Sequence, residues 1–378
     1  MYYRDTILKI DLDIIKSNVQ VYKDLNPNKD FFMIVKSNGY SLGDKVIADL
    51  ALEMGAQYVC VSSIDEAVCL RLQGYKEPIL CLGYVNKEHF DVCKEYDITL
   101  SIDNLEHALF LSNSDINNLK CHIKIDTGMN RLGFKEIDDV KKAIEFVKDK
   151  HYIEGIYSHY QESEDRIGLR TDKQYARFKE VVEALDYDFK YIHIDNSEAA
   201  LYRSDSITNA FRLGIGYVGT TEGKNDNLKQ AVSLFTRTTI CKRVKKDETV
   251  GYGAIYTFDE DSWLNTLPIG YADGFLRSNQ NRRVYIDGEY GYIVGKICMD
   301  QCMVKTTKEY PTNTLVEIFG PHISLSQYAK ENKSNEHISL CTLSERVVRE
   351  YIKDGKIVKS IHPRLIHLEK GAVKKPKK

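Results

Sequence analysis

A lysine lies at the end of the first long apolar run of the sequence. Residues 31–40 read FFMIVKSNGY, so Lys36 follows five apolar side chains and precedes the turn-forming residues Ser37, Asn38 and Gly39. Such a run predicts a central strand, and burying an unpaired ammonium group at its end is costly. At the carboxyl end of a barrel strand, a lysine can bind a carbonyl compound covalently or act as a base. Taken alone, the stretch favours a plainer interpretation, in which Lys36 extends along a strand edge into solvent.

Other polar residues follow later apolar runs in the same way. They are cations, a histidine and side chains with oxygen atoms, namely Lys124, Asp126, His159, Asn196, Ser197 and Arg212, the last followed by Gly214. Each is a weak signal alone, because a histidine after a strand is as often structural as catalytic. Backbone N–H groups near residues 214–216 and the hydroxyl of Ser197 suit a phosphate dianion. A lysine together with a phosphate site suggests pyridoxal 5′-phosphate (PLP) as the cofactor.

The elements that must position these residues form an alternating series. Apolar strands and amphipathic helices follow one another at short spacing from residue 31 to residue 215, and eight strands can be counted. This pattern predicts a (β/α)8 TIM-type barrel, which we assign to residues 12–229. The carboxyl ends of barrel strands meet at one mouth, so we expect the polar residues to converge there.

A mainly β region follows the barrel. Strand-like alternation with frequent glycine occurs in segments 232–244, 249–257, 263–268, 283–294 and 297–306. This pattern predicts a C-terminal mainly β domain over residues 230–378. Residues 1–11 contain one more strand, which is a candidate to pack with that domain. The basic residues after Glu369 are predicted to form a frayed end.

Composition excludes several classes of protein. Hydrophobic residues make up 43% of the 378 residues, charged residues 29%, and the formal net charge is −2. These values are typical of a soluble globular protein and favour neither nucleic acid nor a membrane surface as a partner. The nine cysteines lack metal-ligand spacing, so we expect no metal, and they suit a reducing compartment. With no secretory segment and no apolar run long enough to span a bilayer, the sequence predicts a cytoplasmic location.

Eight motifs, in order along the chain, carry a resemblance to one enzyme family. They are IVKSNGYSLG (34–43), KIDTGMNRLGF (124–134), YSHYQESED (157–165), DNSEAAL (195–201), RLGIGYVG (212–219), VGYGAIYTF (250–258), LPIGYADGF (267–275) and GKICMDQCMV (295–304). With these motifs the chain resembles the alanine racemases nearly end to end. Alanine racemases are PLP-dependent isomerases with an N-terminal barrel and a C-terminal β domain, so the resemblance implies the same fold and cofactor here.

The resemblance also implies a racemisation that uses two bases. Lys36 matches the lysine that holds PLP covalently and acts as one base, and Tyr252 matches the tyrosine that acts as the other base from the partner subunit. Two bases on opposite faces can remove the α-proton from one side and return a proton to the other. The resemblance therefore implies a homodimer with shared active sites, acting on a small amino acid.

Further positions match the family's contacts to the cofactor and the substrate. Arg212 matches the arginine that faces the pyridine nitrogen, and His159 matches the histidine bonded to that arginine. Arg131 matches the arginine beside the cofactor's phenolic oxygen and the substrate, and Lys124 matches a lysine that is often carbamylated and holds this arginine. The remaining matched positions are the phosphate contacts Tyr40, Ser197, Gly214 and Ile215 and the substrate-side residues Tyr271 and Met299, which come from the partner subunit in the family.

The substrate is less strongly indicated than the reaction. The leading interpretation is conversion of L-alanine to D-alanine, which supplies D-amino acid for peptidoglycan in the cell wall. Glu345 stands where many members carry a tyrosine near the phosphate, which keeps a serine or broad-specificity racemase as the alternative. Two other classes fit less well: Tyr252 and Arg212 disfavour a PLP decarboxylase, and a PLP-carrier protein usually lacks the second domain.

Overall fold

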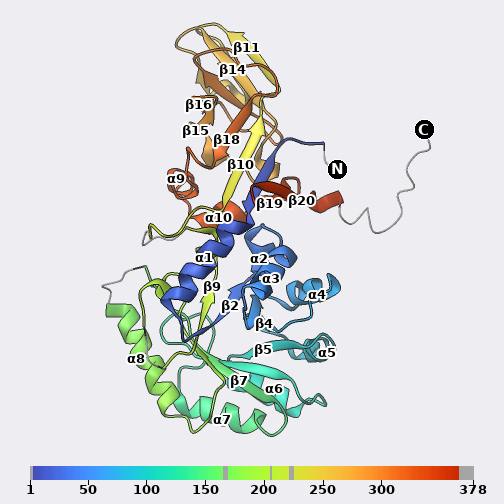
Figure 1. Cartoon of the computed structure of the whole chain (residues 1–378), viewed down its shortest axis with the longest axis vertical. Coiled ribbons are helices and arrows are strands. Elements are labelled where there is room, and N and C mark those ends of the chain that lie inside the picture. The colour runs from blue at the N-terminus through green and yellow to red at the C-terminus, as the bar shows by residue number, and fades with distance from the viewer. Residues whose placement is uncertain (1–2, 165–168, 205–206, 221–224, 366–378) are drawn as a thin grey trace, which may run out of the picture. The chain divides into compact units, whose positions relative to one another are not determined.

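The computed structural model of the chain describes residues 3–164, 169–204, 207–220 and 225–365, and these fall into two compact units (Figure 1). One unit comprises residues 16–228, and the other comprises residues 1–15 together with residues 229–378. The predicted frayed end after Glu369 lies outside the described residues. Among the residues that are described, no helix has the length and apolar character needed to cross a bilayer.

Eight strands close into a parallel barrel in the unit of residues 16–228 (Figure 1). Their bounds are β2 Asp30–Ile34, β3 Tyr58–Val61, β4 Ile79–Cys81, β5 Ile98–Ile102, β6 Lys120–Lys124, β7 Tyr152–Tyr157, β8 Tyr191–His193 and β9 Ala210–Leu213. The barrel closes through parallel pairing of β2 with β9, in which Phe32 lies opposite Arg212. The predicted (β/α)8 barrel is therefore confirmed, with β2 as the strand that precedes Lys36.

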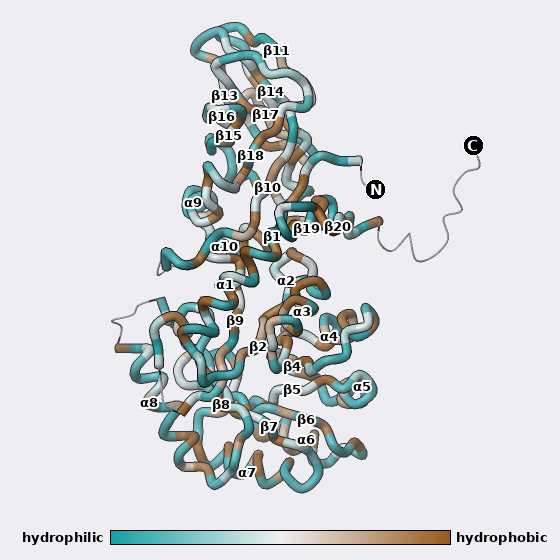
Figure 2. Tube along the Cα trace, viewed as in Figure 1, coloured by the Kyte–Doolittle hydropathy of each residue, from teal (hydrophilic) through white to brown (hydrophobic). Residues whose placement is uncertain are grey.

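Helices alternate with these strands and cover the barrel. They are α1 Leu12–Leu25, α3 Asp44–Glu53, α4 Ile64–Leu72, α5 Phe90–Glu95, α6 Leu105–Asn113, α7 Ile137–Val147 and α8 Leu169–Glu183, with short 3-10 helices η1 Lys87–His89, η2 Ala199–Leu201 and η3 Ile215–Val218. Every residue of β3 and of β5 is buried, as expected for strands with side chains inside the barrel on one face and helices on the other. Figure 2 shows the hydrophobic character of β2 and of the helix α3.

The second unit is built on a ten-stranded sheet in the order β11-β14-β17-β16-β15-β18-β10-β1-β19-β20. Its strands are β1 Ile7–Asp11, β10 Val232–Arg237, β11 Ile240–Val244, β14 Ser262–Leu267, β15 Arg283–Ile286, β16 Glu289–Val294, β17 Cys302–Thr306, β18 Leu315–Phe319, β19 Val348–Lys353 and β20 Lys356–Ile361. Strand β1, from the start of the chain, pairs with β10 and with β19. The helices α9 (Leu325–Glu331) and α10 (Glu336–Cys341) join this sheet in a mainly β unit, as predicted.

Several of the segments with predicted strand character are interrupted in the structure. Residues 232–244 form β10 and β11, and residues 283–294 form the hairpin of β15 and β16, whose turn places Asp287 and Gly288 at φ of 41° and 93°. Of the segment 297–306, only β17 is a strand. Residues 298–301 form a turn instead, because the N–H of Cys298 donates to the carbonyl of Gln301 at 2.9 Å.

Candidate active site

The five residues that follow Lys36 adopt the left-handed helical backbone conformation. Residues 37–41 all have φ between 54° and 65°, so the short segment α2 (Lys36–Tyr40) is not an ordinary helix. Each L-residue in this conformation costs about 1–2 kcal/mol, and glycine and asparagine bear it best. Asn38 and Gly39 lie at the centre of the turn, which reverses the chain within a few residues and leaves the Lys36 side chain exposed.

Contacts from two neighbouring elements hold this turn. The Glu66 carboxylate on α4 accepts the N–H of Ser37 at 2.7 Å, and its other oxygen accepts the N–H and the hydroxyl of Ser62 at 2.7 and 3.0 Å. On the other side, the hydroxyl of Tyr217 in η3 donates to the carbonyl of Gly39 at 3.3 Å. The turn is therefore anchored both to α4 and to η3, which fixes where β2 delivers Lys36.

Arg212, on β9, is buried and has its guanidinium surrounded by acceptors. Nη1 donates to Nδ1 of His193 at 2.6 Å and to the carbonyl of His193 at 3.3 Å. Nη2 donates to the carbonyls of Ser158 and Ile194 at 2.8 and 2.9 Å and to Nδ1 of His159 at 3.2 Å. None of these partners is an anion, and desolvation lowers the pKa of Arg212. An arginine still keeps its proton under these conditions, so Arg212 acts only as a donor.

His159 lies two residues after β7, and the charges of several cationic side chains of this unit act on its ring. Desolvation, followed by the charges of Arg212, Lys124, Arg131 and Lys36, holds the pKa of His159 well below its ordinary value. The ring is therefore neutral at physiological pH and can accept the hydrogen bond from Arg212 at Nδ1. Arg212 contacts this ring directly, and the charges of the other three predicted site residues also act on it.

Lys124 is the last residue of β6 and is only 6% exposed. Its ammonium donates to the carbonyl of Ile125 at 3.0 Å and lies 4.9 Å from the centre of the Tyr157 ring. Desolvation, and then the charge of Arg212, lowers the pKa of Lys124 to about 7. A substantial neutral fraction of this amine is thus present near neutral pH, and the neutral amine is the nucleophilic form.

Arg131 lies in a loop that returns to the same strand end. The N–H of Phe134 donates to the carbonyl of Lys124 at 2.9 Å, and the N–H of Asp126 donates back to Phe134 at 2.8 Å. The loop borders a cavity of about 350 Å³ lined by Asp103, Asn104, Asp126, Asn130, Arg131, Leu132, Gly133 and Lys135. Arg131 is exposed, so its guanidinium is available to an anionic ligand at this cavity.

Hydroxyl and backbone N–H groups converge after β9. The N–H groups of Gly214 and Gly216, on either side of Ile215, donate to Oγ of Ser197 at 2.8 and 3.3 Å. A Cβ atom at Gly214 would lie 2.6 Å from the hydroxyl of Tyr40 and 3.6 Å from Oγ of Ser197. The hydroxyls of Tyr40 and Ser197 thus lie beside Gly214, and the absence of a side chain at this residue leaves space next to them. This donor set fits a phosphate dianion, and with Lys36 and Arg212 in the same unit it fits PLP.

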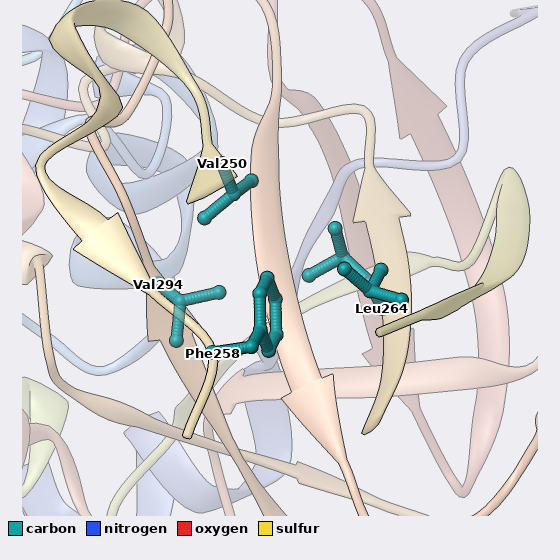
Figure 3. Packing of buried hydrophobic residues seen from close by; sticks show 5 residues of the cluster. Val250, Phe258, Leu264 and Val294 are labelled. Carbon is teal, nitrogen blue, oxygen red and sulfur yellow. The ribbon is translucent and has the colours of Figure 1, made fainter. Parts of the chain in front are cut away.

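The other unit presents Tyr252 on an exposed hairpin. Tyr252 begins η4 (Tyr252–Ala254), between β12 (Thr249–Val250) and β13 (Tyr256–Thr257), and its side chain is 68% exposed. The glycines on both sides have φ of 74° and 75°, which a bulkier residue rarely adopts. A buried apolar cluster supports the base of the hairpin (Figure 3) and consists of Val244, Val250, Phe258, Leu264 and Val294. The hairpin is thus rigid at its base while the tyrosine at its tip faces outward.

Tyr271 and Met299 lie on two loops that are bonded to each other. The N–H of Tyr271 donates to the carbonyl of Cys298 at 3.1 Å, and the N–H of Ala272 donates to the carbonyl of Met299 at 3.0 Å. The buried carboxylate of Asp273 accepts the N–H of Gly270 at 2.9 Å, and the guanidinium of Arg4 binds the same carboxylate. These contacts set the spacing of Tyr271 and Met299.

Glu345 has an exposed side chain in the loop between α10 and β19. Its neighbour Arg346 binds Asp300 at 2.8 Å and Asp273 at 3.4 Å, so the chain before β19 is tied to the loops of Tyr271 and Met299. Desolvation lowers the pKa of Arg349 to about 10, and the charge of Glu345 opposes that shift. Glu345 therefore adds a negative charge to a group of arginines on this unit.

Two residues of the site had no functional role in the sequence analysis. Glu66 lies in an ordinary amphipathic helix, and His193 ends β8 without any motif of its own. His193 could have been noticed because it is a titratable residue at a strand end, the criterion that selected His159. Glu66 gave no comparable signal, since its role depends on the left-handed turn after Lys36.

Comparison with known proteins identifies the family of this chain. Residues 10–222 match the model of the alanine racemase N-terminal domain, and residues 231–351 match the model of the alanine racemase C-terminal domain. The chain is 36% identical to an alanine racemase of Halalkalibacterium halodurans, over 94% of this chain and 97% of that protein. It is 34% identical to alanine racemase 1 of Bacillus subtilis, over 96% of this chain and 97% of that protein.

Solved structures agree with these sequence matches. An alanine racemase from Bacillus anthracis with bound L-Ala-P has a TM-score of 0.90 at 32% identity, covering 96% of this chain and 98% of that chain. A histidine racemase from Leuconostoc mesenteroides subsp. sake has a TM-score of 0.86 at 28% identity, covering 93% of this chain and 99% of that chain. Amino-acid racemases with different substrates therefore share this fold.

Proposed function

Because this chain belongs to the alanine racemase family, we propose that it interconverts L-alanine and D-alanine with PLP as cofactor. The observation that carries the proposal is the hydrogen bond from buried Arg212 to Nδ1 of His159 at 3.2 Å, with the charges of Lys124, Arg131 and Lys36 also acting on that ring. A covalently held PLP supplies an electron sink that acidifies the α-proton of the bound amino acid. The side chains of this chain must then hold the cofactor, orient the substrate and move one proton.

Two bases carry the proton transfer. The amine of Lys36 takes the α-proton on one face or returns it there, and the hydroxyl of Tyr252 of the partner subunit does the same on the other face. The order of the two steps reverses with the direction of the reaction, so one pair of groups serves both enantiomers. The left-handed turn behind Lys36 and the apolar base of the Tyr252 hairpin keep these two groups in place.

Arg212 would limit how strongly the pyridine ring of PLP withdraws electrons. Arg212 would donate a hydrogen bond to the pyridine nitrogen of bound PLP and keep its own proton, so the ring would not be fully protonated. Side reactions that need a strongly electron-withdrawing ring, such as transamination, are then disfavoured. His159 and His193 support this role because each accepts a hydrogen bond from the guanidinium and leaves the proton on Arg212.

The phosphate and the substrate carboxylate bind to separate groups. Tyr40, Ser197, Gly214 and Ile215 would hold the phosphate, and Arg131 would bind the phenolic oxygen of the cofactor and the substrate carboxylate. The neutral amine of Lys124 would attack carbon dioxide and release one proton to solvent, and the resulting carbamate anion would place a negative charge beside Arg131 and fix its guanidinium. The pKa of Lys124 of about 7 supports this modification.

We infer a homodimer with shared sites. Tyr252 and Met299 are 68% and 52% exposed in a single chain, and Ile255, three residues after Tyr252, is 53% exposed. Exposure of apolar and aromatic side chains in one region is typical of a surface that another chain covers. The functional domains proposed are residues 12–229 for cofactor binding and 230–378 for the partner-facing residues, with residues 1–11 contributing β1 to the second domain.

The cellular role follows from the product. D-alanine biosynthesis supplies a building block of peptidoglycan, so the enzyme serves cell-wall synthesis. All nine cysteines are free thiols, which supports a cytoplasmic location because reducing compartments keep thiols unpaired.

The test compares substrates on purified, PLP-loaded protein. L-alanine and L-serine are supplied separately, and the D-enantiomers are measured by chiral chromatography. Rapid formation of D-alanine with slow formation of D-serine supports the proposal. Equal or faster formation of D-serine would instead assign a serine or broad-specificity racemase, the alternative that Glu345 keeps open. Absence of any D-product would refute a racemase.

A further inference from the structure

The pairing of β6 and β7 is irregular at His122. Cys121 lies opposite Ile153, but the next residue, His122, lies opposite Gly155, so the register shifts by one residue and Glu154 is the extra one. A β-bulge of this kind redirects side chains and usually has a structural or functional purpose. Here it places a residue without a side chain directly opposite a histidine.

The ring of His122 fills the space that a side chain at residue 155 would take. A Cβ atom added at Gly155 would lie 2.6 Å from Cε1 and 2.6 Å from Nδ1 of His122. The ring is fully buried, with the aromatic rings of Tyr58 and Tyr191 centred 5.6 and 6.1 Å away. The bulge and the glycine therefore form a slot for this imidazole inside the barrel.

Nδ1 of His122 lies 3.0 Å from Nε2 of His193, and His193 in turn lies next to Arg212. Since a guanidinium only donates, Nδ1 of His193 must accept the hydrogen bond from Nη1 of Arg212. A neutral His193 then carries its proton on Nε2 and donates it to Nδ1 of His122. The hydrogen bonds thus run in one direction, from Arg212 through His193 to His122.

Both imidazoles are held in the neutral form. Desolvation, and then the charge of Arg212, lowers the pKa of His122 to about 3 and keeps the pKa of His193 well below its ordinary value. His122 therefore carries its one proton on Nε2, and that atom has no hydrogen-bond partner within the part of the chain that the structure describes. A buried donor without a partner is costly, and its presence here indicates that the accepting role of Nδ1 outweighs the cost.

We propose that His122 is a positioning residue for racemisation: by accepting the proton of His193 Nε2, it fixes the tautomer of His193 and thereby the orientation of Arg212. In the opposite tautomer, His193 would point an N–H group at the guanidinium, and one of the acceptors that hold Arg212 would be lost. His122 touches neither cofactor nor substrate and acts only through His193. The proposal rests on the role of Arg212 in the proposed function.

The first test reads the tautomers directly. In the PLP-loaded protein labelled with ¹⁵N-histidine, the ring nitrogen shifts and couplings of His122 and His193 should report protonated Nε2 and unprotonated Nδ1 in both rings. Single variants at each histidine assign the signals. A protonated Nδ1 in either ring, or an imidazolium at neutral pH, would overturn the proposal. This reading does not depend on whether the protein racemises alanine, so its failure is separate from failure of the proposed function.

The second test uses three substitutions. His122→Phe keeps the ring volume but removes the acceptor, and it should lower kcat for L-alanine by about tenfold, as expected when a buried group loses one hydrogen bond. His122→Asn places an amide oxygen near the position of Nδ1 and should restore most of this loss. Tyr58→Phe is the control, because it removes a hydroxyl bonded to Glu154 and Thr99 in the same core and keeps the ring that lies beside His122.

The pattern of the three variants separates positioning from simple packing. The proposal predicts a loss in kcat for His122→Phe with KM changed by less than about twofold, and a shift in the visible absorbance of bound PLP. An Asn variant as poor as the Phe variant, or a Tyr58→Phe variant with the same loss, would mean that the core only needs to be well packed. Unchanged kcat in His122→Phe would contradict the proposal outright.

Discussion

The carboxylate of Glu66 accepts the backbone N–H of Ser37 at 2.7 Å, one residue beyond Lys36. The same carboxylate binds Ser62 after β3, so one side chain joins the ends of two neighbouring barrel strands. The turn that follows Lys36 is costly in its left-handed conformation. The contact with Glu66 is therefore expected to matter for the placement of Lys36.

Replacing Glu66 with glutamine tests this contact. The amide can accept with one atom only and must direct its NH2 group at a backbone donor, which should cost about 1–3 kcal/mol and lower kcat/KM for L-alanine. Thermal unfolding and steady-state kinetics measure the two effects. The control is Asp65→Asn on the exposed side of the same helix, which should change neither. Wild-type kinetics in Glu66→Gln would mean that the turn holds Lys36 without this carboxylate.

Tyr252→Phe tests the second base. The substitution removes only a hydroxyl from an exposed ring, so PLP should bind with unchanged absorbance while turnover of L-alanine falls by at least about 100-fold. Tyr256→Phe is the matched control, because that ring packs against Phe258 at the base of the same hairpin. Turnover in Tyr252→Phe equal to that of the control would remove Tyr252 from the mechanism.

Ser197→Ala tests the phosphate contacts. It deletes the oxygen that accepts the N–H groups of Gly214 and Gly216, and the affinity for PLP should fall by about 10- to 100-fold, as expected for loss of hydrogen bonds to a charged group. Titration of the apoprotein with PLP, followed by absorbance, measures this change. Ser163→Ala removes another buried hydroxyl, bonded to Asn196, and should leave the affinity unchanged. Equal affinities of the two variants would place the phosphate elsewhere.

The lowered pKa of Lys124 predicts that the free energy of unfolding depends on pH. Burial lowers its pKa to about 7 in the folded protein, whereas a lysine in an unfolded chain titrates near about 10.4. Between these values the unfolded chain binds more protons, so the free energy of unfolding rises with pH. Below about pH 7 both states are protonated, and the cost of the buried charge is fully present. Lys124→Met should therefore raise the melting temperature more at pH 6 than at pH 9.

Calorimetry in buffers free of carbon dioxide measures this difference without carbamylation. Lys120→Met, at the start of the same strand and paired with Asp97 at 3.4 Å, is the control and should show no such trend. A gain for Lys124→Met that is equal at both pH values would contradict a lowered pKa. Adding labelled bicarbonate to the wild type should then give a carbamate signal in the ¹³C NMR spectrum that Lys124→Met lacks.

Much of the barrel could be predicted because its strands are short apolar runs between clear helices. The polar residues at the strand ends could be selected for the same reason, since a parallel barrel directs those ends to one mouth. The left-handed turn could not be predicted, because a run of five residues in that conformation is unfavourable for serine and tyrosine and depends on contacts with Glu66 and Tyr217. The sequence of the turn itself does not indicate that these two residues contact it.

The histidines inside the barrel show a second limit. His122 and His193 come from alternate strands, which share layers inside a barrel, but their contact depends on the bulge at Gly155. Period-two alternation assumes a regular register, and one extra residue changes which side chains face inward. In the second unit, strand-like alternation begins at residue 297 but β17 begins only at Cys302, because the backbone bond of Cys298 to Gln301 has no signal in the pattern of apolar residues.

Complementation between two inactive chains shows whether each active site is shared between two subunits. Lys36→Ala and Tyr252→Phe, co-expressed with different affinity tags, are purified as the heterodimer. If each site combines Lys36 of one chain with Tyr252 of the other, one of the two sites has both bases intact. The heterodimer should then show about half of the wild-type activity, as expected for a symmetric dimer with two shared sites. Activity no higher than that of either single variant would contradict a site shared between subunits.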